Sequence, residues 1–327
     1  MDQLAEPVVN PEAKAKPSAL RKHSETIAFV VMVAALMAAP FFTYPLFLMQ
    51  AMCFALFALA FNLLIGYVGL LSFGHALYFG WASYLSAYSA KAWGFPPELA
   101  ILTGVATAAL CGLVAGSLAI RRLGIYFAMV TLALAQMMYF VALQAKLTGG
   151  EDGIQGVPRG KLFGLFNLQN EMTMYVVVLA IFLAGFLFIY RIIHSPFGEV
   201  LKAIRENETR AISLGYKTDR YKLVAFVLSA TLAGLAGGTK AIVVQLASLT
   251  DVTWQMSGEV VLMTLVGGLG TIFGPIVGAF VIVAMQNYLN ALDQWVTVIQ
   301  GVIFVTCVLL FRRGIVGELA NILRIKL

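Results

Sequence analysis

The sequence predicts an all-α polytopic membrane protein with eight to ten transmembrane helices, some of them Gly-interrupted or re-entrant. Hydrophobic residues make up 61% of the 327-residue chain and charged residues only 12%, so water cannot be the solvent for most of its surface. Several apolar runs reach the ~20 residues that cross a hydrocarbon core of ~30 Å as a helix. The alternating pattern of a barrel strand is absent, which leaves helices to satisfy the backbone in lipid.

The first half of the chain divides into helices at prolines, glycines and short charged turns. The apolar block at about 27–66 is too long for one span, and Pro40 and Pro45 split it into two helices. A segment at about 69–90 is rich in Gly, Ser and aromatic residues. Arg121 and Arg122 separate the next two expected helices, which cover about 97–120 and 122–145.

The second half alternates polar and apolar stretches. A polar loop leads to an expected helix at about 172–193, and a charged stretch separates that helix from another at about 223–249. Residues 257–290 are long for one span and short for two, and "VGGLGTIFGP" lies in their middle. We therefore expect a broken or re-entrant pair there, followed by a last helix at about 294–312.

Basic residues indicate the orientation. The chain is expected to have a cytoplasmic tail (1–26), a membrane domain (27–312) and a second cytoplasmic tail (313–327). With both termini inside, the turn at Arg121 and Arg122 and the large loop at about 194–222 are also cytoplasmic, as the positive-inside rule requires. The net charge of +6 is spread over these loops and therefore indicates membrane orientation rather than binding of nucleic acid. The three cysteines lie in apolar runs and show no disulfide or metal-site spacing.

The charged loop is the main polar excursion of the chain, because residues 197–222 hold ten of its 38 charged residues. Wound as one helix, it would place Lys202, Arg205 and Glu206 away from an apolar face and Arg210 at the edge, with Gly215 as the C-cap. The residues that share that face are Val200, Ala203, Ile204, Asn207, Ala211 and Leu214. Two interpretations remain open: a solvated loop that enforces topology, or a coupling helix that docks into a cytoplasmic motor.

Two glycine-rich segments, "GYVGLLSFG" (66–74) and "GGLGTIFG" (267–274), have glycines at comparable spacing. Paired interruptions of this kind are typical of broken helices around a membrane site, while close helix packing is the simpler explanation. The candidate path residues are therefore the polar residues and glycines of these segments, together with Asn62 just before the first. They are Asn62, Gly66, Gly69, Ser72, Gly74, His75, Gly267, Gly268, Gly270 and Gly274. For Asn62, Ser72 and His75, interhelical hydrogen bonding competes with substrate contact.

The loop "TGGEDGIQGVP" (148–158) carries two adjacent acids, Glu151 and Asp152. Its glycines and Pro158 favour an ordered turn over a catalytic or calcium pair. Lys240 lies inside an apolar stretch, so its side chain is expected to snorkel or to line the path near the outer side.

Four stretches together resemble the LivM-like permease subunits of branched-chain amino-acid ABC transporters. The most specific is "FGEVLKAIRENETRAISLGYKTDRYKLVAFVLSATLAGLAGG" (197–238), which matches the family's cytoplasmic loop and following helix. "GYVGLLSFGHALYFGWASY" (66–84), "LTGGEDGIQGVP" (147–158) and "GGLGTIFGPIVGAF" (267–280) agree with it. The resemblance covers about residues 50–317. Leu70 departs from the family, which often has Gln at that place.

The resemblance implies a bacterial inner-membrane importer. Its partners would be a homologous second permease subunit, two cytoplasmic ATPase subunits and a periplasmic solute-binding protein. The residues implied in coupling to the ATPase are Arg205, Glu206, Asn207, Glu208, Arg210 and Gly215, and Glu151 and Asp152 are candidates for docking the binding protein. The 327 residues contain no G-x-x-x-x-G-K-[ST] loop, so ATP and Mg²⁺ are expected on the partner subunits, with no cofactor, metal or catalytic residue in this chain.

Other functions remain open at this point. Permeases for urea or short amides share the same architecture. A stand-alone channel or secondary carrier would need ionisable groups in the membrane, for which Glu259 is the main candidate. A membrane enzyme is disfavoured because neither H-E-x-x-H nor G-x-S-x-G occurs.

Overall fold

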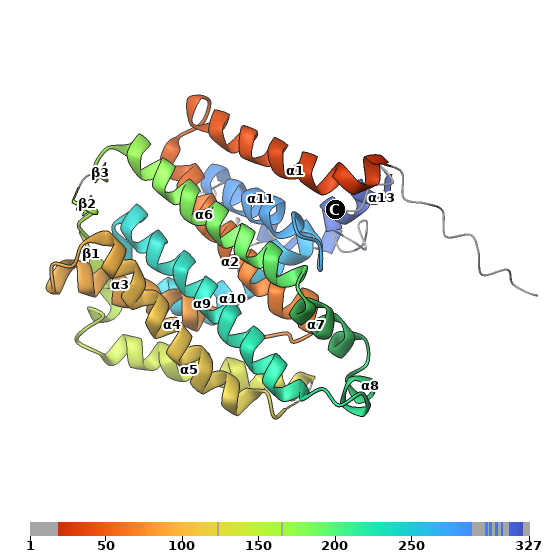
Figure 1. Cartoon of the computed structure of the whole chain (residues 1–327). Helices are drawn as coiled ribbons and strands as arrows, with labels where there is room; N and C mark the ends of the chain where they lie inside the picture. The colour runs from red at the N-terminus through yellow and green to blue at the C-terminus, as the bar shows by residue number, and fades with distance from the viewer. Residues whose placement is uncertain are drawn as a thin grey trace, which may run out of the picture.

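The computed structural model describes residues 19–122, 124–164, 166–289 and 314–322, with a few positions between 298 and 309. It confirms the helical fold class (Figure 1). The helices are α1 (Ala19–Ala38), α2 (Pro45–Asn62), α3 (His75–Ala92), α4 (Pro97–Ala119), α5 (Ile125–Gln144), α6 (Glu171–Ile193), α7 (Pro196–Glu206), α8 (Glu208–Ser213), α9 (Thr218–Val244), α10 (Trp254–Gly267), α11 (Gly274–Leu289) and α13 (Gly314–Ile322). The helix expected at 294–312 lies largely outside the described residues, as do the ends of both tails.

Helix boundaries follow the local chemistry. Proline occupies the first turn of α2, α4 and α7, where its missing N–H costs nothing. The side chain of Asn170 accepts from Met172 N at 3.1 Å and caps α6. The expected break between residues 257 and 290 is present between α10 and α11. Helix α1 begins at Ala19, inside the expected tail, because a helix can continue past the apolar residues that cross the lipid.

Five segments in the described part of the chain are long and apolar enough to cross a membrane. They are Pro45–Val68, Pro97–Ala119, Ile125–Gln144, Glu171–Ile193 and Thr218–Val244. Helices α10 and α11 are shorter because the glycine segment divides them. The total of eight to ten passes stays a prediction.

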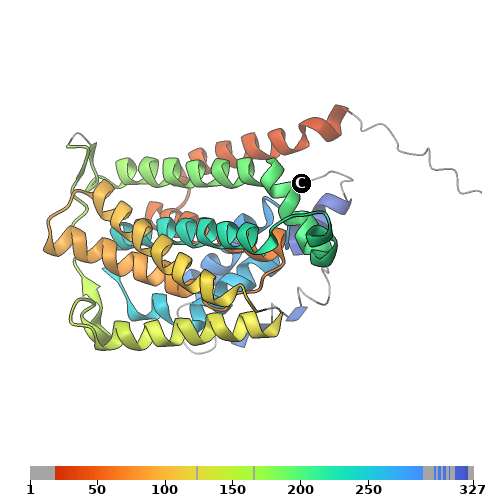
Figure 2. The same cartoon turned by 60° about the horizontal axis from the view of Figure 1, so that its bottom comes forward.

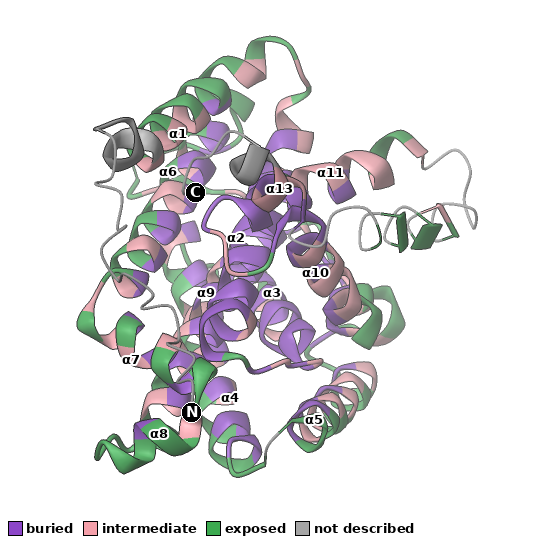
Figure 3. Ribbon diagram, turned by 90° about the vertical axis from the view of Figure 1, so that its right-hand side faces the viewer, coloured by how far each residue is buried: buried purple, intermediate pink, exposed green. Residues whose placement is uncertain are grey.

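The core of the bundle is formed by α2, α3 and α9, which are buried almost throughout (Figure 3). Small residues let α4 approach this core closely. A Cβ added at Gly112 of α4 would stand 2.5 Å from the Cβ of Ala230 on α9, and one added at Gly104 would stand 2.6 Å from the carbonyl oxygen of Ala82 on α3. Helix contact through small residues is how membrane bundles gain van der Waals packing in lipid.

The two ends of the bundle differ. At one end, β1 (Ile154–Gln155) pairs antiparallel with β4 (Leu246–Ala247), and β2 (Lys161–Leu162) pairs with β3 (Phe166–Asn167). The short helices α7 and α8 lie at the opposite end, as does the turn between α4 and α5 (Figures 1 and 2). The predicted external loop and the predicted cytoplasmic loop are therefore on opposite sides of the molecule.

Candidate translocation and coupling site

The first glycine segment lies where α2 changes its winding. After Asn62 the helix continues as a π-helix over Leu63–Val68, and Gly69 ends it with a φ of 83°. Glycine is the residue that adopts this left-handed conformation without a steric penalty. π-helical turns are rare and are frequent at functional sites, so this end of α2 is a candidate site.

The second glycine segment forms the turn between α10 and α11. Gly268 and Gly270 have φ values of 128° and 72°, which an L-residue with a side chain rarely adopts. A Cβ on Gly267 would overlap the carbonyl of Gly274, so the two helix ends touch backbone to backbone. The turn therefore depends on its glycines for both conformation and contact.

Asn62 joins the two segments across 208 positions of sequence. Its Nδ2 donates to the carbonyl oxygen of Thr271 at 2.9 Å, and its Oδ1 accepts from Gly270 N at 3.0 Å. A Cβ on Gly66 would stand 3.0 Å from Gly270 N and against the Asn62 amide. The structure thus brings Asn62, Gly66 and Gly270 together, and the amide satisfies backbone groups that the broken helices leave open.

Arg205 reaches this junction from α7. Its Nη1 donates to the carbonyl oxygen of Gly66, and its Cγ lies 3.2 Å from where a Cβ on Gly69 would be. The same Nη1 would be 3.4 Å from a Cβ on Gly270. Arg205 was predicted to lie away from the apolar face of the loop helix, and it is exposed, but the end of its side chain also reaches back to the bundle. Its long side chain turns back because a carbonyl freed by the π-helix gives the guanidinium a charge-assisted hydrogen bond.

The predicted single helix across the charged loop is also wrong. The chain breaks at Asn207 (φ −157°, ψ 97°), whose side chain accepts from Arg210 N at 3.0 Å and starts α8. The expected common face is therefore divided: Ile204 on α7 and Ala211 on α8 are buried, whereas Ala203, Asn207 and Leu214 are exposed. Leu201, which was not expected on that face, is buried instead. Gly215 has a φ of 89° just after α8, as expected of a C-cap residue.

The remaining coupling candidates lie mostly at the surface. Glu206, Asn207 and Arg210 are exposed, while Glu208 forms an ion pair with Lys222 at the start of α9. Only 3% of the Lys222 side chain is exposed, against 27% for Glu208. This pair, which the sequence analysis missed, fixes the end of the loop to the longest membrane helix.

His75 belongs to a second cluster at the start of α3. The Ser229 hydroxyl donates to Ala60 O at 2.5 Å, so the His75 Nε2 must donate to the Ser229 oxygen, 2.8 Å away. The rings of Phe61, Tyr78 and Phe226 pack edge-on around the imidazole. Among the described residues the His75 Nδ1 has no partner. His75 thus links α3 to α9, and it does not share the Asn62 junction.

Ser72 and Gly74 also lie at the start of α3. The Ser72 hydroxyl accepts from Gly74 N at 3.2 Å, while a Cβ on Gly74 would stand 2.6 Å from the carbonyl oxygen of Thr131 on α5. Both residues therefore make local contacts at this helix start, and their place on a substrate path stays a prediction.

Glu151 and Asp152 are exposed on a single 3₁₀ turn, Gly150–Asp152. Gly149, Gly150 and Gly153 all have positive φ values, which makes the turn ordered by its glycines. Its position at the β1 end of the bundle agrees with an external loop, and the docking role of the two acids stays a prediction.

A buried ion pair near the same end was also missed by the sequence analysis. Lys240 Nζ donates to both carboxylate oxygens of Asp251, at 2.8 and 2.7 Å. The exposed fractions are 6% for the Lys240 side chain and 3% for Asp251. The expectation that Lys240 snorkels or lines a path is wrong, because the segment after α9 folds back and supplies a carboxylate.

Comparison with known proteins identifies the chain's relatives. Residues 44–308 match the profile of the branched-chain amino acid transport system / permease component family. The chain is 26% identical to the high-affinity branched-chain amino acid transport system permease protein LivM of Escherichia coli, over 84% of this chain and 70% of that protein. It is 25% identical to the fructose import permease protein FrcC of Rhizobium meliloti (66% and 63%) and 30% identical to the ribose import permease protein RbsC of Bacillus subtilis (55% and 58%). No solved structure gives a significant match.

Proposed function

The chain belongs to the family of permease components of branched-chain amino acid transport systems, and on that premise we propose that it is the membrane subunit of an importer for branched-chain or related amino acids. It is a multi-pass membrane protein of an ABC-type permease family and is not the catalytic subunit. In this proposal both termini are cytoplasmic in a bacterial inner membrane. A second permease subunit, two ATPase subunits and a periplasmic binding protein complete the importer.

The Arg205 contact carries the mechanistic part of the proposal. One side chain connects the α7–α8 excursion to the Gly66 carbonyl, and Asn62 connects that turn to the turn at Gly270. A force applied to α7 from outside the bundle would therefore act on both interruptions of the membrane helices at once. This arrangement supports a gate that an external motor moves.

The outer side of α8 supports docking to such a motor. Ile212, Leu214 and Tyr216 are exposed there next to charged residues, and 69% of Leu214 is accessible. Exposed apolar side chains with a polar rim are typical of the central part of a protein interface. In the proposal, these three side chains enter the ATPase cleft, and Glu206 and Arg210 contribute to specificity at its edge.

Uptake by the assembled importer in proteoliposomes tests the proposal. We expect ATP-dependent uptake of leucine, isoleucine or valine that requires the binding protein. Arg205→Ala should lower uptake at least tenfold while the ATPase stays bound. Leu214→Ser should instead weaken ATPase binding by about ten- to a hundredfold, since burying a leucine is worth ~1.5–3 kcal/mol.

Lys202→Ala provides the matched control, because it removes one positive charge from α7, and among the described residues Lys202 pairs only with Glu199, three residues earlier. Equal effects of Lys202→Ala and Arg205→Ala would contradict the gating role. Uptake without ATPases would favour a secondary carrier over an importer subunit.

A sugar is the second candidate substrate, because two of the relatives are named fructose and ribose import permeases. Urea and short amides complete the set of solutes to compare. An excess of each solute is tested for its ability to inhibit leucine uptake, and direct uptake of each solute is measured as well. Uptake of a sugar with no amino-acid uptake would overturn the substrate assignment and leave the subunit assignment intact.

A further inference from the structure

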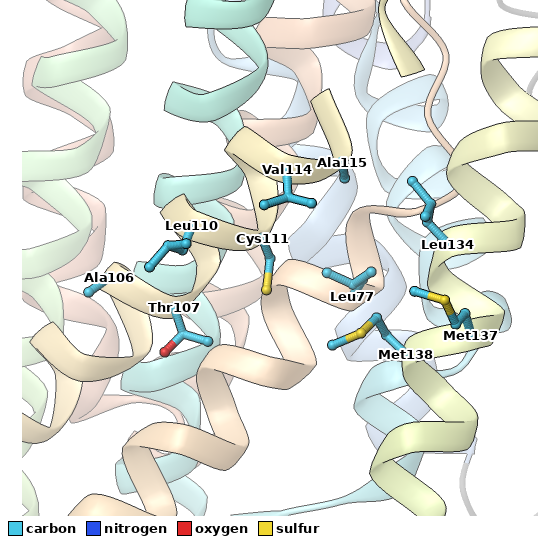
Figure 4. Close-up of a pocket in the computed structure, with 10 residues that line it drawn as sticks. All are labelled: Leu77, Ala106, Thr107, Leu110, Cys111, Val114, Ala115, Leu134, Met137 and Met138. Carbon is cyan, nitrogen blue, oxygen red and sulfur yellow. The ribbon is translucent and has the colours of Figure 1, made fainter. Parts of the chain in front are cut away.

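A deep apolar groove separates α4 from α5 on the outer side of the bundle (Figure 4). Its volume is about 350 Å³, and α3 forms its floor through Leu77. The Cys111 sulfur of α4 points into the space, opposite Leu134 and Met138 of α5 (Figure 4). Helix α5 thus stands away from α4 at mid-depth in the membrane domain.

The groove offers almost nothing to a polar solute. Thr107 carries its one hydroxyl group, and that hydroxyl already donates to the carbonyl oxygen of Thr103 at 2.7 Å. A water in a cavity needs two to four polar partners, so a site of this composition does not hold ordered water. Hydrocarbon is the ligand chemistry that fits.

Positive charge lies at one end of the groove. Arg121 and Arg122 follow α4 directly, both are exposed, and neither forms an ion pair among the residues that the structure describes. Arg122 and Tyr126 line a second cavity, also about 350 Å³, on α5. Tyr126, Val130, Leu134 and Met138 recur every four residues, so one stripe of α5 runs from the second cavity to the groove.

The spacing suits one lipid. Arg121 and Leu110 are eleven residues apart, which is about 16 Å along a helix that rises 1.5 Å per residue. One leaflet contributes about half of a ~30 Å hydrocarbon core, or ~15 Å. We propose that this groove binds an anionic phospholipid of the leaflet on the α7–α8 side. Arg121 and Arg122 hold its phosphate, and one acyl chain lies between α4 and α5 and ends near Cys111.

The two arginines favour a lipid over a helix of another subunit as the occupant. Basic pockets between membrane helices at the cytoplasmic side are typical binding sites for anionic headgroups.

Native mass spectrometry of the full-length chain tests the site. The protein is extracted from membranes with its associated subunits and mixed with phosphatidylglycerol or, separately, phosphatidylethanolamine. We expect the wild type to retain phosphatidylglycerol preferentially. Each arginine near an anionic surface is worth about fivefold in affinity, so Arg121→Gln with Arg122→Gln should lower phosphatidylglycerol retention about twenty- to thirtyfold. Retention of phosphatidylethanolamine should fall much less, because its phosphate is balanced by its own ammonium group.

Cys111→Phe fills the groove and should lower retention of both lipids. Leu113→Phe is its control, because it places the same side chain at the same depth on the opposite, exposed face of α4. Because the arginine variants change only the surface, they test the proposal even if Cys111→Phe misfolds. Equal retention of the two lipids by the wild type would overturn it. So would unchanged binding in the double arginine variant, or a cross-link from Cys111 to another subunit.

Discussion

Replacing Lys240 with methionine isolates the energetic role of the buried Lys240–Asp251 pair. Methionine fills most of the same space and removes the charge, so the Asp251 carboxylate, with only 3% of its side chain exposed, loses both bonds to the ammonium group. Among the described residues, the donor that remains to Asp251 is Ser248 N, at 3.4 Å. Breaking a buried pair from one side typically costs 3–5 kcal/mol, because it leaves a charge without compensation. We expect a loss of about that size in the free energy of unfolding.

The double variant Lys240→Met with Asp251→Leu shows whether the loss comes from the unpaired charge. Replacing both partners by apolar groups of similar volume is often neutral, so the double variant should regain most of the stability lost by Lys240→Met. Thermal or denaturant unfolding of the purified full-length chain in detergent is measured for the wild type, both single variants and the double variant. A loss below ~1 kcal/mol for Lys240→Met, or a double variant at the sum of the two single losses, would refute the reasoning.

Three further predictions follow from close contacts and charge burial. Gly66→Ala should abolish transport because its Cβ would stand 3.0 Å from Gly270 N, whereas Gly258→Ala, with nothing within 4 Å, should leave uptake unchanged and serve as the control. Glu208→Gln should destabilise the chain more than Lys222→Met in unfolding measurements, since it leaves a lysine with 3% exposure unpaired instead of a glutamate with 27%. Gly215→Ala should cost ~1 kcal/mol in the same measurements through its φ of 89° alone, and a neutral effect would contradict the assigned backbone strain.

The membrane architecture could be predicted because lipid imposes simple rules on sequence. The apolar runs located α4 and α6 to within a residue or two at each end, and the glycines at 267–274 indicated the break between α10 and α11. The break at Asn207 was missed although it has a local signal. Asparagine followed by an acidic residue is a typical helix start, but the apolar spacing across it favoured one continuous helix.

The contacts that define the site could not be predicted in this way. The bond from Arg205 to Gly66 spans 139 positions, and the pairing of Lys240 depends on how the segment after α9 folds back to Asp251. Nothing in the composition of either segment specifies its partner. Asn62 was correctly predicted to be an interior polar residue. Its partners, the Thr271 carbonyl and the Gly270 N–H, could be identified only from the tertiary structure.

The Arg205 link between the α7–α8 excursion and the Gly66 carbonyl is a single hydrogen bond at the end of a flexible side chain. An N–H···O bond keeps its donor and acceptor about 2.7–3.2 Å apart and is absent at about 3.6 Å. A shift of α7 that the side-chain torsions of Arg205 can follow leaves the Gly66 turn in place, whereas a larger shift must either pull that turn or break the bond. Transmission through this chain is therefore expected to be stepwise, with one engaged and one released position, rather than graded with the size of the push.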